Sequence, residues 1–197
     1  MGNETVRQLI LGLLCGGLAL STMSCHVRDQ DPALKTIQIY DLMTALPRAT
    51  AHVHSAKYMA RADALVGDEV RPALLLHPAA SVDFPAVQLP GNAVLTFRIG
   101  IDQAVWDKPG DGVDFSVFVV RSNDAAVKVF SRYLDPKHRP EDRHWIEERI
   151  TLAAFHDEEV HIKLVTAPGP ADDFAYDWAV WSAPQIVLTD TTIPTWQ

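Results

Sequence analysis

Apolar and polar positions alternate along most of the chain from about residue 36 onward. In Ala93–Ile101, Leu95, Phe97 and Ile99 alternate with polar or small residues, and Val113–Val119 repeats the pattern. A period of two places successive side chains on opposite faces of a strand, so each segment buries one face. The pattern therefore predicts strands rather than helices.

Similar runs recur at short intervals and are separated by Pro, Gly, Asp and Asn. The predicted strands are Thr36–Leu42, Ala51–His54, Arg71–His77, Ser81–Gln88, Ala93–Ile101, Val113–Val120, Val127–Leu134, Trp145–Leu152, Val160–Thr166, Ala175–Trp181 and Gln185–Leu188. Only Met43–Leu46 and Tyr58–Leu65 have a helical pattern, and neither is long enough for a crossover between parallel strands. The predicted fold is all-β: two antiparallel sheets packed face to face as a jelly-roll β-sandwich.

The N-terminus has a different pattern. Leu9–Leu20 contains no charged residue, follows Arg7, and is itself followed by small residues that lead to Cys25. A helix needs about 20 apolar residues to cross a bilayer, and this run is shorter. It is typical of the apolar region of a signal peptide.

The residues before Cys25 resemble a bacterial lipoprotein signal, in which the cysteine is acylated, with palmitate for example, and becomes residue one. Thr22, Met23 and Ser24 stand where that signal usually has Leu, a small residue, and Gly or Ala. Plain secretion with cleavage after Ser21, or an uncleaved anchor, is the alternative. The resemblance implies lipidation of Cys25, a membrane anchor, and a location in the bacterial cell envelope.

These features divide the chain into four parts. They are a signal peptide (1–24), a polar tether (25–35), a β-sandwich domain (36–190) and a C-terminal tail (191–197). Cys15 would leave with the signal peptide, and Cys25 has no later cysteine as a partner. An apolar core, rather than a disulfide, must therefore hold the domain together.

Charge and composition exclude other classes. The 197 residues include 17 Lys and Arg against 25 Asp and Glu, which gives a net charge of −8, and 48% of the residues are hydrophobic. No stretch concentrates enough basic residues to cover a phosphate backbone, so nucleic acid is not expected as a partner. The apolar content is that of a globular domain.

Several aromatic and charged segments occur in a distinctive order. These segments are Leu74–Pro78, Trp106–Phe115, Phe130–Lys137, Arg143–Trp145 and Phe174–Trp181. Together they resemble β-sandwich domains of the galactose-binding-like type, which occur as sugar-binding modules beside glycosidases and as parts of membrane glycosyltransferases and sulfatase-like envelope proteins. The resemblance spans roughly residues 71 to 188. It implies the fold more than the ligand, because this fold also hosts lipid binding and protein contacts.

Aromatic rings beside carboxylates indicate a possible sugar site. On a strand through Ala175–Trp181, Tyr176 and Trp178 would lie on one face, and Asp177 and Trp181 on the other. An indole can stack on the C–H face of a pyranose while a carboxylate holds its hydroxyls. The candidate ligand-binding residues are Trp106, Asp107, Arg132, Asp177, Trp178 and Trp181. Burial in the core is the alternative for the tryptophans.

Loops carry function in many β-sandwiches because the sheets hold them while their side chains remain free. We therefore expect the Trp106–Asp111 turn and the Asp135–Arg143 loop to contribute more to binding than either sheet face. Trp106 follows a strand directly, so it is either a stacking surface or a cap on the open end of the core.

Three carboxylates flank the glycines of one turn. Asp107, Asp111 and Asp114 surround Gly110 and Gly112 and could supply oxygen ligands to a structural Ca²⁺. The alternative is a plain turn, since glycine and aspartate are common turn residues. The histidines lack a third ligand at a fixed spacing, so zinc is not predicted.

The sequence contains no Gly-x-Ser-x-Gly, no His-Glu-x-x-His and no phosphate-binding glycine loop. The predicted function is therefore that of a non-catalytic envelope lipoprotein whose β-sandwich binds carbohydrate or a glycan-bearing surface. The alternative is a protein–protein accessory domain that docks on an envelope enzyme or complex.

Overall fold

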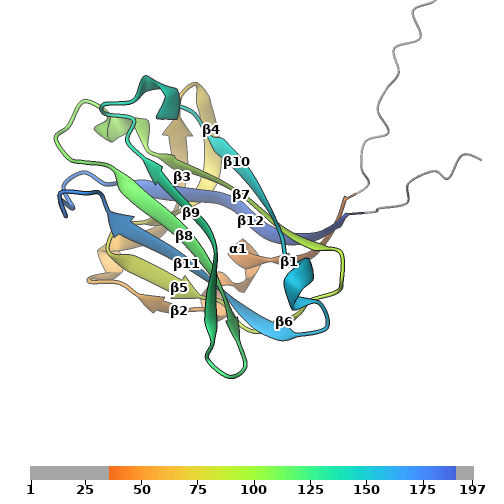
Figure 1. Cartoon of the computed structure of the whole chain (residues 1–197). Coiled ribbons are helices and arrows are strands. Elements are labelled where there is room, and N and C mark those ends of the chain that lie inside the picture. The colour runs from red at the N-terminus through yellow and green to blue at the C-terminus, as the bar shows by residue number, and fades with distance from the viewer. Residues whose placement is uncertain (1–35, 190–197) are drawn as a thin grey trace, which may run out of the picture. The chain divides into compact units, whose positions relative to one another are not determined.

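The computed structural model describes residues 36–189 as one compact unit built of two antiparallel sheets (Figure 1). The first sheet has the order β10-β7-β12-β4-β3, with β1 beside β12. The second has the order β2-β5-β11-β8-β9, with β6 beside β11. The predicted all-β, two-sheet β-sandwich is confirmed.

The strands are β1 (Thr36–Asp41), β2 (Thr50–His52), β3 (Met59–Val66), β4 (Glu69–Leu76), β5 (Ala80–Asp83), β6 (Val87–Gln88), β7 (Ala93–Ile101), β8 (Val113–Arg121), β9 (Ala126–Leu134), β10 (Ile146–Thr151), β11 (Glu159–Pro168) and β12 (Ala179–Thr189). One α-helical turn, α1 (Leu42–Ala45), follows β1. Short 3-10 turns occur at Leu46–Arg48, Ala56–Tyr58, Gln103–Val105, Pro140–Asp142 and Ala153–Phe155.

The core lies between the facing sides of the two sheets. Leu95, Phe97 and Ile99 of β7 and Phe115 and Val117 of β8 are buried there, as their spacing of two predicts. Each is almost completely removed from water, which makes apolar burial the main favourable contribution to the stability of the domain.

The helix predicted at Tyr58–Leu65 is wrong, because this segment forms β3 and pairs with β4 over its whole length. Near the turn between the two strands, Ala64 and Val66 of β3 pack with Ala73, Trp145 and Val180 in a second, smaller apolar cluster. Pairing with β4, rather than the helical spacing of its own residues, determines the structure of this segment, because the pairing also buries an apolar cluster.

The two strands predicted at Ala175–Trp181 and Gln185–Leu188 are joined differently in the structure. A single strand, β12, begins only at Ala179 and continues through the second segment, with a shift of register between Ser182 and Gln185. Residues 175–178 form a loop instead, in which Tyr176 has a positive φ of 58°.

The signal peptide, the whole tether with Cys25, and the C-terminal tail lie outside the described residues. Within residues 36–189, no helix is long and apolar enough to cross a membrane.

Candidate functional site

The loop before β12 carries three large apolar side chains that remain in contact with solvent. Phe174, Tyr176 and Trp178 keep 44%, 44% and 41% of their surface exposed. They line one side of a cavity of about 770 Å³ together with Ala175. This aromatic cavity, lined by His54, Tyr58, His77, Pro78, Ala79, Phe174, Ala175, Tyr176 and Trp178, is the candidate site.

The opposite side of the aromatic cavity comes from the segments that flank the β3–β4 hairpin. The ring of Tyr58 lies 4.8 Å from that of His77 and 6.4 Å from that of His54, between ring centroids. His77 Nδ1 lies 2.9 Å from the carbonyl oxygen of Pro78. Because a carbonyl only accepts, Nδ1 carries the proton, and Nε2 of the neutral ring is left as an acceptor.

Among the sequence-predicted residues, Trp178 belongs to the aromatic cavity and Trp181 does not. Trp181 is completely buried, and its ring lies 5.3 Å from those of both Phe97 and Phe115. Asp177, between the exposed Tyr176 and Trp178, is also completely buried. Tyr176 and Trp178 are thus exposed and Asp177 is buried, but strand alternation is not the cause, because β12 begins only at Ala179. Asp177 and Trp181 do not share a strand face: Asp177 pairs with Lys137, and Trp181 lies in the core.

Trp106 has the geometry of a cap on the core. Its Nε1 donates a hydrogen bond to the Ile101 carbonyl at 2.8 Å, and its ring packs against both apolar clusters. The guanidinium of Arg143 lies 5.7 Å from the ring centroid. Asp107 is exposed and pairs with Lys108 at 3.1 Å. Neither Trp106 nor Asp107 lines the aromatic cavity.

Arg132 also lies away from the aromatic cavity. Its Nη1 makes an ion pair with Glu148 Oε1 at 2.8 Å, which joins β9 of one sheet to β10 of the other. The arrangement gives this arginine a role between the sheets.

The three carboxylates proposed for Ca²⁺ point to different partners. Asp111 Oδ2 accepts from the Ala171 N–H, Asp114 Oδ1 accepts from Ser131 Oγ at 3.2 Å, and Asp107 pairs with Lys108. Among the described residues, no group of three or more His, Cys, Asp or Glu gathers as metal ligands would. The predicted calcium ligands are therefore not brought together.

A protein cation lies beside the predicted calcium turn. The Lys137 ammonium, from the loop after β9, is 3.0 Å from the Pro109 carbonyl, 3.3 Å from the Ala175 carbonyl and 3.4 Å from Asp177 Oδ1. Both side chains of the Lys137–Asp177 pair are buried, with 3% and 0% of their surface exposed. Through its contacts with Pro109 and Asp177, Lys137 links the turn before β8 to the loop that carries the exposed aromatic rings.

Burial dominates the electrostatics of Asp177. Loss of hydration raises its pKa to about 7, with smaller upward contributions from Asp111 and Asp173, while Lys137 acts in the opposite direction. Asp177 Oδ2 has no hydrogen-bond partner. The attraction of Lys137 therefore does not fully offset the loss of hydration of the ionised carboxylate.

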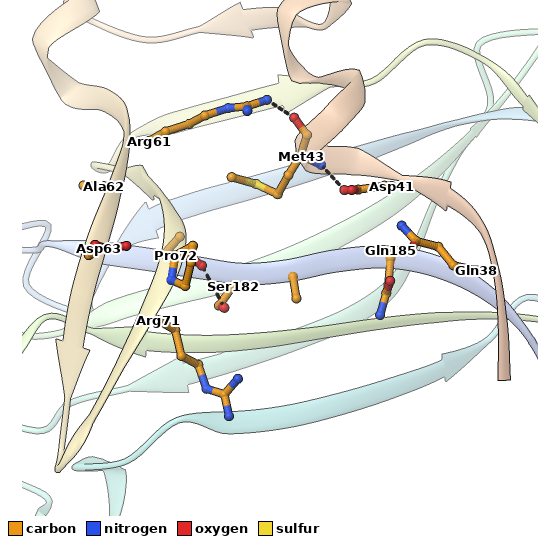
Figure 2. Close-up of a pocket in the computed structure, with 12 residues that line it drawn as sticks. Gln38, Asp41, Met43, Arg61, Ala62, Asp63, Arg71, Pro72, Ser182 and Gln185 are labelled. Carbon is orange, nitrogen blue, oxygen red and sulfur yellow. Dashed lines mark hydrogen bonds between the residues drawn. The ribbon is translucent and has the colours of Figure 1, made fainter. Parts of the chain in front are cut away.

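A second hollow, of about 660 Å³, lies where the neighbour of β12 changes from β4 to β1 (Figure 2). Two of its side chains donate to carbonyls of the lining: Arg61 donates to the Met43 carbonyl, and Ser182 Oγ donates to the Pro72 carbonyl at 2.9 Å. Its lining contains no aromatic ring. The hollow therefore lacks a stacking surface for a sugar.

Sequence reasoning missed His54, Tyr58, His77, Phe174 and Tyr176. The alternation of Phe174, Tyr176 and Trp178 was a usable signal, because three large rings on one side of a short segment require either a core or a ligand. Tyr58 and His77 gave no such signal, since only the folding of the β3–β4 hairpin brings them to this loop.

Comparison with known proteins places the fold among β-sandwich modules. No family model matches the sequence. An uncharacterized protein of Archaeoglobus fulgidus is 38% identical over 125 residues, which are 60% of this chain and 31% of the archaeal protein. The chain thus spans about a third of the length of that relative.

Two similar solved structures contain carbohydrate-binding modules. The CBM51-2 and INT domains of Clostridium perfringens ZmpB have a TM-score of 0.50 and 16% identity, over 79% of this chain and 32% of theirs. CBM51 of Clostridium perfringens GH95, in complex with methyl-galactose, has a TM-score of 0.48 and 14% identity, over 77% of this chain and 99% of its own. The likeness to the ZmpB domains, with a TM-score of 0.50 at 16% identity, supports the β-sandwich fold alone.

Proposed function

We propose that this protein is a non-catalytic carbohydrate-binding module and that its aromatic cavity holds a sugar ring. The observation that carries the proposal is the exposure of Phe174, Tyr176 and Trp178 around a single cavity. Contiguous exposed apolar surface on a soluble domain marks an interaction site. Rings that are half exposed can stack on the C–H face of a pyranose.

The polar groups around the aromatic cavity suit hydroxyl groups. Tyr58 and Tyr176 each bring a phenolic hydroxyl, and His77, whose Nδ1 bonds to the Pro78 carbonyl, has Nε2 left for a hydroxyl. Apart from the histidines, the lining residues carry no charge. A pocket with apolar walls and a few polar groups is typical of small-molecule sites, and this one favours an uncharged sugar.

Attachment to a membrane is the second part of the proposal. We propose that Cys25 is acylated and that the domain is held at the cell envelope, since the apolar run Leu9–Leu20 is too short to span a bilayer. A lipid-anchored sugar-binding domain would hold the protein against a glycan-bearing surface without catalysing a reaction there.

A glycan array tests the sugar-binding part. The full chain in detergent should bind at least one glycan saturably, and Trp178→Ala should weaken this binding at least tenfold with little change in melting temperature. Val70→Ala, which shortens another exposed apolar side chain, is the matched control and should bind normally.

If the wild-type protein binds no glycan and instead co-purifies with an envelope enzyme or complex, the accessory-domain alternative replaces this proposal. If Trp178→Ala binds as tightly as the wild type, the aromatic cavity is not the site.

A further inference from the structure

The loop that carries the aromatic rings is tied to the sandwich mainly near its ends. The Trp178 carbonyl accepts from the Asp102 N–H at 3.0 Å, and the Ala171 N–H donates to Asp111. Between these points Tyr176 has a positive φ, a conformation that a non-glycine residue keeps only where its surroundings hold it.

Lys137 supplies the contacts in the middle of this loop. Its ammonium has three donors, and three acceptors surround it: the Pro109 and Ala175 carbonyls and Asp177 Oδ1. Two of these acceptors belong to the aromatic loop, on either side of Tyr176. The third belongs to the turn before β8, so the ammonium joins two segments far apart in sequence.

Gly110 makes room for this ammonium. A Cβ added at Gly110 would collide with Lys137 Nζ and would lie 2.5 Å from the Ala175 carbonyl oxygen. Glycine is therefore required at this position for two reasons. It allows three segments to approach closely, and it adopts a positive φ of 131° without strain.

We propose that Lys137 is the positioning residue of the aromatic cavity, fixing the Ala175–Asp177 backbone so that Phe174, Tyr176 and Trp178 line one cavity. This inference rests on the proposed function for its binding consequence. Its consequence for the position of the loop does not depend on any ligand and can be measured separately.

A buried ion pair raises the question of whether Lys137 serves stability alone. Replacing both members of such a pair with apolar residues is often neutral or stabilising, whereas removing one member leaves an unpaired buried charge. A double variant can therefore restore stability without restoring the hydrogen bonds that Lys137 donates to the Pro109 and Ala175 carbonyls.

The experiment compares Lys137→Met and Lys137→Met/Asp177→Leu with the wild type, all as full chains. Lys163→Met is the control, because Lys163 also pairs with an aspartate, Asp83 at 3.2 Å, but does not line the aromatic cavity. Melting temperature, hydrogen exchange of residues 170–178 and binding to the glycan array are measured for each protein.

We expect the double variant to melt at or above the temperature of the single variant, with amide exchange in residues 170–178 at least tenfold faster than in the wild type. Its binding to the array should be at least tenfold weaker, the scale of losing charge-assisted hydrogen bonds. Lys163→Met should change neither exchange in this loop nor binding.

Wild-type exchange and binding in the double variant would overturn the inference and leave Lys137 with a structural role. If the wild type binds no glycan, the proposed function fails, and exchange then decides the positioning role. Fast exchange confined to residues 170–178 supports it, and unchanged exchange contradicts it.

Discussion

At the scale of single residues, burial makes the ionised form of Asp177 less favourable in the folded protein. The pKa of Asp177 is raised to about 7 chiefly by burial, even though Lys137 beside it acts in the opposite direction. Loss of hydration of the carboxylate therefore exceeds the attraction of the ammonium, as is common for buried ion pairs. The raised pKa gives no sign that this contact is there for stability, whereas its geometry joins two loops.

The raised pKa of Asp177 predicts an unusual dependence of stability on pH. Between its ordinary value of 3.8 and about 7, the folded state binds more protons at this site than the unfolded state, so stability falls as pH rises. Asp177→Asn removes this effect. The free energy of unfolding of both proteins is measured with urea at pH 5 and pH 8. From pH 5 to pH 8, the difference between the two should change in favour of the variant by an amount on the order of a few kcal/mol. Equal differences at both pH values would contradict the prediction.

Trp178, in the loop before β12, and Trp181, within β12, should differ sharply in their effect on stability. Trp181 is enclosed by Phe97 and Phe115, so Trp181→Ala should cost about 3–5 kcal/mol of unfolding free energy by opening a cavity. Trp178 is half exposed, so Trp178→Ala should cost much less. Chemical denaturation of both variants checks the contrast, and similar losses would show that Trp178 also supports the core.

At the scale of the elements, hydrophobic alternation predicted most of the sandwich. It placed β7 and β8 correctly because each has one face in the core, so that the period of two is complete in the sequence. It failed at β3, because Ala60, Arg61, Ala62 and Asp63 are all exposed and only Ala64 and Val66 are buried, so no period of two runs along the whole strand. Pairing with β4 decides that segment, and pairing is not visible in its own residues.

The packing of the β3–β4 hairpin on the sheet depends on Gly100 of β7. A Cβ added there would lie 3.0 and 3.1 Å from the two γ-carbons of Val66, which is tighter than ordinary contact. Gly100→Ala should therefore destabilise the domain by about 1–3 kcal/mol through overpacking. Gly91→Ala is the control, because its Cβ would meet only His156 at 3.9 Å.

Thermal or urea unfolding of both glycine variants measures this difference. Adding Val66→Ala to Gly100→Ala should recover part of the loss, because the contact is then relieved. If the Gly100 variant matches the Gly91 variant in stability, the hairpin adjusts freely and its packing on β7 contributes little.

At the scale of the whole molecule, the candidate site is assembled from segments that are distant in sequence. The cavity needs Tyr58 and His77 from the ends of one hairpin and the aromatic loop before β12, while Lys137 comes from the loop after β9. Antiparallel pairing brings these strand ends together: Val180 of β12 lies opposite Leu75 of β4, and Leu76 of β4 lies opposite Met59 of β3. The sequence showed the aromatic residues Tyr176 and Trp178 but not the segments that complete the cavity, because their proximity is a property of the folded sheets.

The proposed attachment to the membrane depends on the N-terminal residues and can be tested without changing the sandwich. The tether reaches the domain at β1, which begins at Thr36, so Cys25 precedes the folded part by a short polar segment. If Cys25 is acylated, the wild-type protein should partition into the detergent phase of a Triton X-114 separation, and Cys25→Ser should shift it to the aqueous phase with an unchanged melting temperature. Cys15→Ser is the matched control and should partition like the wild type. A Cys25→Ser protein that remains in the detergent phase would indicate that the apolar run Leu9–Leu20 itself, uncleaved, holds the chain at the membrane.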